Sequence, residues 1–206
     1  MKQKKLFSVI ALLSERLCSI LPMFFWLFLI FGFEEPLIAI ITVVSALLHE
    51  CGHIGYILWR RGRPKDMRAT INGFRIKKNT SLSYGEEICL YLSGPAVNLL
   101  LFIVASLLTL VFGEICYLIA VINLATALSN LIPIEGYDGY GAIIAYLHLR
   151  EESEAAERLI SGISTALIFL LTLLSLYFID RLGGGYWIFA VFFVSTLRHM
   201  DQGLVK

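Results

Sequence analysis

Residues 36–59 read PLIAIITVVSALLHECGHIGYILW, an apolar stretch whose second half contains His49-Glu50-Cys51-Gly52-His53. A helix that crosses the hydrocarbon layer needs about 20 mostly apolar residues, and this stretch is long enough. Residues four apart share one helix face, so both imidazoles can bind one zinc ion, with Glu50 beside them as a base. The alternative is a set of polar residues bonded to a neighbouring helix. Because ionisable groups inside a membrane span cost about 2.5 to 3.5 kcal/mol each, we favour a functional site.

The composition indicates a membrane protein. The chain has 206 residues, of which 58% are hydrophobic and 16% charged, and its mean hydropathy is +0.77. Soluble domains are about a quarter charged, so the composition excludes one soluble domain, a disordered chain and a secreted disulfide scaffold. A net charge of +1 gives no general attraction for polyanions, which excludes a nucleic-acid binder.

Six apolar segments are candidate spans: 17–33, 36–59, 88–112, 115–133, 159–179 and 186–197. The last is short, so five spans are the fallback. The fold class predicted is an all-α polytopic membrane protein. We expect a single integral-membrane domain over residues 1–206, with no appended soluble domain.

The basic residues predict the orientation. With six spans and a cytoplasmic N-terminus, sixteen of the seventeen Lys and Arg residues fall on one side, and Arg181 alone falls on the other. Cytoplasmic loops are enriched in Lys and Arg, so we expect a multi-pass cell-membrane protein with both termini in the cytoplasm.

Two cytoplasmic segments are long. In residues 60–87, Asn72-Gly73 lies between short β-prone stretches, which predicts a β-hairpin on the cytoplasmic side after the second span. Residues 151–158 read EESEAAER, which we interpret as a solvated helical linker.

A catalytic zinc ion needs a third protein ligand besides two histidines. The candidates are His148, His199, Glu135 and Asp138. Asp138 is favoured because Pro133 ends the fourth span and glycines flank the acid, so its carboxylate can turn inward. The predicted topology puts it in the same half of the membrane as His49. Glu135 remains the rival.

A third element lies in the third span, where the chain reads Gly94-Pro95-Ala96-Val97-Asn98. Gly-Pro loosens a helix and exposes backbone groups, and Asn98 offers both a donor and an acceptor. Either Asn98 serves a site, or it bonds across a kinked helix to a neighbouring one.

In this order, the three elements resemble the site-2 protease family of intramembrane zinc metallopeptidases. The motifs stand here as His49-Glu-Cys-Gly-His53, Gly94-Pro-Ala-Val-Asn98, and Asn130-Leu-Ile-Pro133 leading to Asp138-Gly139, and the resemblance covers about residues 36–140. The predicted spans and cytoplasm-side site are most similar to the subgroup typified by the sporulation sigma-factor-precursor protease. The resemblance implies that His49, His53 and Asp138 bind one Zn²⁺ and Glu50 is the general base. It also implies that Asn98 and Asn130 contact the substrate.

The resemblance implies hydrolysis of peptide bonds in or near transmembrane segments of membrane-tethered proteins or precursor peptides. It leaves room for a homo-oligomer or a regulatory membrane partner. One departure is Gly136-Tyr137, where the family usually has Pro-Leu, and this bears on substrate fit more than on zinc binding. The alternatives are a non-catalytic protein that binds or transports metal ions, and a degenerate scaffold. The intact His-Glu-x-x-His argues against the scaffold.

Overall fold

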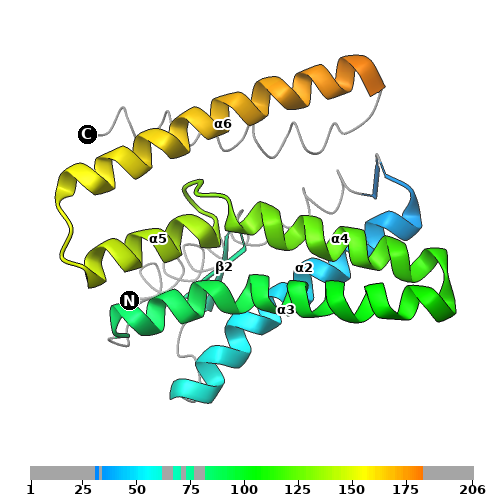
Figure 1. Cartoon of the computed structure of the whole chain (residues 1–206), viewed down its shortest axis with the longest axis horizontal. Helices are drawn as coiled ribbons and strands as arrows, with labels where there is room; N and C mark the ends of the chain where they lie inside the picture. Colours follow the sequence, from blue (N-terminus) through cyan, green and yellow to red (C-terminus); the bar gives the residue numbers. More distant parts are fainter. Residues whose placement is uncertain (1–30, 33, 62–66, 71–72, 77–81, 183–206) are drawn as a thin grey trace, which may run out of the picture.

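A computed structural model describes residues 31–32, 34–61, 67–70, 73–76 and 82–182, and these form a helical membrane fold (Figure 1). The main helices are α2 (Pro36–Arg61), α3 (Tyr84–Phe112), α4 (Glu114–Leu131), α5 (Asp138–Leu149) and α6 (Glu154–Leu182). Of these, α2, α3, α4 and α6 are long and apolar enough to cross a membrane. They correspond to the second to fifth predicted spans. The predicted spans 17–33 and 186–197 lie almost wholly outside the described residues, so the total of six stays a prediction.

Helix α3 is the centre of the described bundle and contacts α2, α4 and α5 (Figure 1). The crossing of α2 over α3 is close because it is built on glycine. A Cβ atom on Gly52 would lie 2.6 Å from the carbonyl oxygen of Ser93. Small residues are buried at several positions of the bundle, among them Ala39, Ala105, Ala120 and Ala127. Small side chains allow membrane helices to pack at short distances, which replaces the hydrophobic driving force that lipid does not supply.

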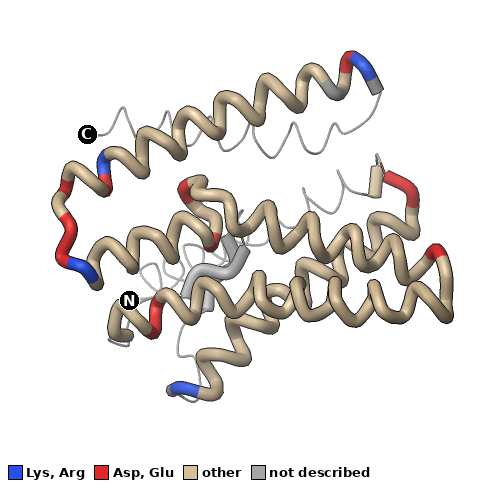
Figure 2. Tube along the Cα trace, in the orientation of Figure 1, with Lys and Arg blue, Asp and Glu red and all other residues tan. Residues whose placement is uncertain are grey.

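The outer surface of the bundle is apolar. Leu110, Val111 and Leu107 are 89%, 75% and 66% exposed, as expected for side chains that face lipid tails. Figure 2 shows that the charged residues of the described chain gather mainly at helix ends and in the connections between helices. This distribution leaves the middle of the long helices mostly apolar and available for the hydrocarbon layer, with Glu50 on α2 as an exception.

Two short strands follow α2. Strand β1 (Met67–Thr70) pairs antiparallel with β2 (Gly73–Ile76), with Met67 opposite Ile76 and Thr70 opposite Gly73. Residues 71–72 lie outside the described chain, so the turn predicted at Asn72-Gly73, and with it the hairpin as a whole, stays a prediction.

Beyond the strands, a capping box of Ser83 and Glu86 starts α3. Arg60 Nη2 lies 2.8 Å from Glu86 Oε1, which joins the end of α2 to this start.

The connection between α4 and α6 contains a helix that the hydropathy pattern did not predict. Helix α5 has 12 residues, too few to cross a membrane, and its first residue is Asp138. Helix α4 ends at Leu131, as expected for a chain with Pro133 two positions beyond it. Residues 151–153 form a short link, and the remainder of the predicted linker is the exposed first turn of α6. Helix α5 therefore brings the chain back to the bundle at Asp138.

Candidate metal centre

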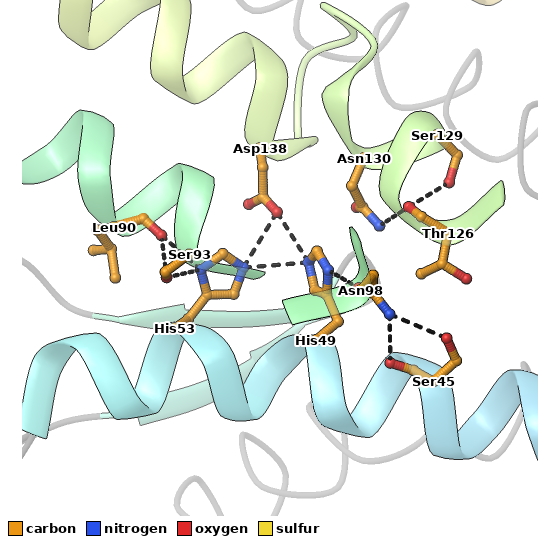
Figure 3. Close-up of polar contacts among 10 residues, drawn as sticks. All are labelled: Ser45, His49, His53, Leu90, Ser93, Asn98, Thr126, Ser129, Asn130 and Asp138. Atoms are coloured by element: carbon orange, nitrogen blue, oxygen red, sulfur yellow. Dashed lines mark hydrogen bonds and ion pairs between the residues drawn. The ribbon is translucent and has the colours of Figure 1, made fainter. Parts of the chain in front are cut away.

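His49 and His53 lie one turn apart on α2, and their Nε2 atoms are 3.2 Å from each other. Both face Asp138 at the start of α5 (Figure 3). Asp138 Oδ2 lies 2.9 Å from His49 Nε2 and 3.2 Å from His53 Nε2. All three potential ligand atoms lie within 4.8 Å of one another, and His49 is only 5% exposed. Asp138, 85 positions beyond His53 in the chain, thus joins the two histidines in one compact donor set.

The hydrogen bonds of the two Nδ1 atoms show which nitrogen of each histidine ring carries the proton. His49 Nδ1 lies 2.7 Å from the amide oxygen of Asn98, and His53 Nδ1 lies 2.8 Å from the carbonyl oxygen of Leu90. These oxygens only accept hydrogen bonds, so both Nδ1 atoms are donors. In the neutral ring, the Nε2 atom then carries a lone pair. Both lone pairs are available on the side of Asp138.

This donor set fits a metal ion. Two imidazole nitrogens and a carboxylate oxygen converge, and Asp138 Oδ2 is buried with no hydrogen-bond partner among the described residues. Three acceptor atoms held together are stabilised by a cation between them. Two histidines with one carboxylate are a ligand set of catalytic zinc sites, and each ring donates its other N–H to an oxygen, as metal-bound histidines usually do.

Three glycines permit the close approaches that build the centre. A Cβ on Gly94 would lie 2.7 Å from His49 Nε2 and would overlap His53 Nε2. A Cβ on Gly139 would overlap the carbonyl of Leu131, and one on Gly141 would overlap the ring of Tyr91. Gly94 therefore lets α3 lie against the histidines, and the other two let α5 pack tightly on α4 and α3.

The turn before Asp138 contains Gly136 and Tyr137. Gly136 has φ +97°, a conformation that favours glycine because it has no Cβ atom. Burial raises the pKa of the neighbouring Tyr137 to about 12.

The turn of α3 just before the Gly-Pro element supplies a second contact to the centre. The carbonyl of Leu90 accepts a hydrogen bond from Ser93 Oγ at 2.6 Å as well as the one from His53. Ser93 Oγ also lies 3.2 Å from His53 Nδ1 (Figure 3). A carbonyl oxygen has two lone pairs, so that of Leu90 can accept bonds from both side chains.

Asn98 lies behind His49. Its side chain is 0% exposed, its oxygen faces His49, and its nitrogen donates to Ser45 and Asn123. Of the two roles left open by the sequence, the structure shows the bond to a neighbouring helix. The predicted contact of Asn98 with substrate stays a prediction.

The other predicted residues lie on α2 and α4. Glu50 is half-buried on α2, in the turn between His49 and His53. Asn130, near the end of α4, donates from Nδ2 to the carbonyl of Thr126 at 3.0 Å.

The rival third ligands lie elsewhere. His148 Nε2 is 2.9 Å from Glu157 Oε1, and the backbone N–H of Glu135 donates to Ser164 Oγ at 2.8 Å. His199 lies outside the described residues. The structure thus brings Asp138, and not Glu135 or His148, to the histidine pair.

The geometry can be compared with known proteins. No protein-family model matches the sequence, and no curated protein sequence matches it. A solved structure does: the site-2 protease from Methanocaldococcus jannaschii superposes with a TM-score of 0.63. The chain has the fold of a site-2 protease. The match covers 90% of this chain and 87% of the archaeal one, at 18% sequence identity. It tests neither the sporulation subgroup nor the orientation of the termini, so these stay predictions.

Two residues at the centre, Ser45 and Asn123, were not predicted from the sequence. Both are buried, and both contact Asn98. The available signal was Asn123 itself, an amide inside an apolar span and two helical turns before Asn130. Polar side chains within spans usually face the bundle interior.

Proposed function

We propose that this protein is an intramembrane zinc metalloprotease that hydrolyses peptide bonds in or near transmembrane segments of membrane-tethered substrates. The observation that carries the proposal is the convergence of His49, His53 and Asp138 on one point among apolar helices. Glu50 on the turn between the histidines and the site-2 protease fold support it further.

The residues divide the chemistry among themselves. Zinc held by the two histidines and Asp138 would polarise the substrate carbonyl and lower the pKa of a water molecule to about 7. Glu50 takes a proton from the attacking water while the oxygen of that water bonds to the carbonyl carbon. Glu50 then gives that proton to the amide nitrogen, which leaves as an amine when the carbon–nitrogen bond breaks. His49 and His53 keep their orientation because Asn98 and Leu90 hold their Nδ1 atoms.

Substrate binding needs an extended chain, because the amides of a helix already have hydrogen-bond partners. Strands β1 and β2 come after α2 in the chain and offer an edge on which an unwound segment could pair. Asn130 stays a candidate for contact with substrate, and the same role for Asn98 would require it to leave its buried contacts.

The wider setting is part of the proposal. The charge distribution supports a multi-pass cell-membrane protein with cytoplasmic termini and a site nearer the cytoplasm. A substrate of the sporulation precursor type, a homo-oligomer and a regulatory membrane partner are compatible with this setting.

Zinc content tests the metal centre. We expect about one zinc ion per chain in the purified wild type, and loss of that zinc in Asp138→Asn, because three protein ligands define a catalytic site. Glu135→Gln is the matched control, since it alters a carboxylate in the same connection that does not face the histidines. Zinc retained by Asp138→Asn and lost from Glu135→Gln would reverse the ligand assignment.

Cleavage of single-span membrane proteins tests the reaction. Wild type and Glu50→Gln are co-expressed with a library of such proteins, and the products are compared. Glu50→Gln should keep zinc and lose cleavage, because glutamine cannot carry the proton. Products that persist in Glu50→Gln would contradict the assigned base. Zinc flux into liposomes without any cleavage would instead support the transport alternative.

A further inference from the structure

A buried chain of polar groups runs from His49 through three helices. Ser45 lies on α2, Asn98 on α3 and Asn123 on α4, and they are 1%, 0% and 3% exposed. Burying an uncharged polar group among apolar helices costs free energy unless the group is hydrogen-bonded. The three side chains meet here because they bond to one another. The chain reaches the metal centre only through His49, since Ser45 and Asn123 contact none of the three ligand atoms directly.

The direction of each hydrogen bond is fixed from the far end. Asn123 Nδ2 donates to the backbone carbonyl of Ile119 at 2.9 Å, so its Oδ1 faces Asn98. That oxygen accepts from Asn98 Nδ2 at 2.9 Å and from Ser45 Oγ at 2.8 Å. A carbonyl oxygen can only accept, so the amide nitrogen of Asn98 is held on this side.

The direction of these hydrogen bonds also sets the bond between Asn98 and the His49 ring. With its nitrogen held by Asn123 and by the carbonyl of Ser45 at 3.2 Å, Asn98 turns its oxygen toward His49 Nδ1. Figure 3 shows this part of the chain, in which Asn98 lies between the His49 ring and Ser45. A reversed amide would place an N–H against Nδ1, and the ring proton would then favour Nε2, on the side of Asp138.

We propose that Asn123 is a positioning residue for His49 and acts through Asn98. Its amide oxygen fixes the orientation of the Asn98 amide, which keeps the His49 proton on Nδ1 and leaves Nε2 free to bind the metal. The inference rests on the proposed metalloprotease function, and it adds a residue that lies outside all three sequence motifs. Ser45 supports the same orientation, because it donates to Asn123 and accepts from Asn98.

Two substitutions of similar size separate this role from simple packing. Asn123→Leu removes the acceptor, and Asn123→Asp keeps one. If the acceptor matters, Asn123→Asp should keep more of the His49 proton on Nδ1 and bind zinc more tightly than Asn123→Leu. If Asn123 only fills space among apolar helices, the order reverses, because leucine is tolerated there and a carboxyl group is not. Thr126→Val is the control on α4, since Thr126 Oγ1 bonds only to the carbonyl of Ile122 in its own helix.

Two measurements follow each variant. Nitrogen-15 NMR of histidine-labelled, metal-free protein reports which ring nitrogen of His49 carries the proton, and His49→Gln identifies the signal among the four histidines. Chelator competition reports zinc affinity. We expect Asn123→Leu to shift protons to Nε2 of His49 and to weaken zinc binding by about three- to tenfold, the range for one hydrogen bond. Asn123→Asp and Thr126→Val should stay near wild type.

The outcomes are decisive in each direction. Unchanged His49 signals and zinc affinity in Asn123→Leu overturn the inference, as does a greater loss in Asn123→Asp than in Asn123→Leu. If Asn123→Asp does not fold, Ser45→Ala replaces it, and a smaller shift of the His49 proton in the same direction supports the inference, whereas no shift overturns it. A wild type that binds no zinc refutes the proposed function instead, and the NMR signal of the metal-free protein still decides the role of Asn123.

Discussion

Gly94 on α3 lies so close to His49 on α2 that a single Cβ atom would stand 2.7 Å from the Nε2 atom. The candidate metal centre therefore depends on a missing side chain as much as on His49, His53 and Asp138. There is no room for a methyl group between the His49 ring and the backbone of Gly94. Protein interiors are tightly packed, so neighbouring residues cannot easily move apart to make room for one. The relationship links the Gly-Pro element to the His-Glu-x-x-His helix.

Gly94→Ala should weaken zinc binding by about 10- to 100-fold, because it displaces the rings that carry the ligand atoms. The measurement is zinc affinity by chelator competition on the folded protein. Gly85→Ala is the control on the same helix, since a Cβ there meets nothing within 4 Å. Equal affinities for both variants would show that the rings do not need this close approach.

Zinc should stabilise the folded chain. A ligand that binds only the native state at 100 times its dissociation constant adds about 2.7 kcal/mol to the free energy of unfolding. We expect the melting temperature of the metal-free wild type to rise on addition of zinc, and that of Asp138→Asn to change little. A similar rise in both proteins would place the bound zinc outside this ligand set.

Gly139→Ala should separate Asp138 from the histidines, because the new methyl group would overlap the carbonyl of Leu131 at the α4–α5 contact. Zinc content should fall although all three ligands are still present in the sequence. Gly162→Ala on α6 is the control, because its Cβ meets nothing within 4 Å. Full zinc occupancy in Gly139→Ala would mean that α5 can shift without losing its ligand.

Asn130→Ala should leave zinc affinity unchanged, because its Nδ2 bonds to the carbonyl of Thr126 and it does not belong to the ligand group. If Asn130 contacts substrate, cleavage should fall by about 100- to 1000-fold, the range for loss of one donor at a developing negative charge. Zinc analysis and cleavage kinetics on one preparation separate the two effects. A loss of zinc would assign Asn130 to the metal centre, and unchanged kinetics would remove it from the substrate contacts.

Local patterns predicted much of the centre. The spacing of His49 and His53 places both on one helix face, and α2 confirms this, because the helical period depends only on neighbouring residues. Hydropathy likewise located the helices α2, α3, α4 and α6. Pro133, the flanking glycines, the topology and a family resemblance together predicted Asp138 as the third ligand. The structure brings Asp138 to the histidines.

Hydropathy missed α5, because a 12-residue helix between two spans resembles a long loop by that measure. The burial of Asn98 behind His49 was also not visible in the sequence, and its contact with substrate stays a prediction. Asn123 belongs to no motif, and its contact with Asn98 joins α3 to α4. Such contacts depend on which faces of two helices meet, and that is a property of the packed bundle.

By itself, the sequence determined that this is a membrane protein with two zinc-competent histidines on one helix face, because composition and helical period act locally. Only the tertiary structure decided which carboxylate completes the group and which nitrogen of each histidine faces it. The reason is physical: a metal centre needs atoms placed to within a few tenths of an ångström, and the packing of Gly52, Gly94 and Gly139 sets those positions.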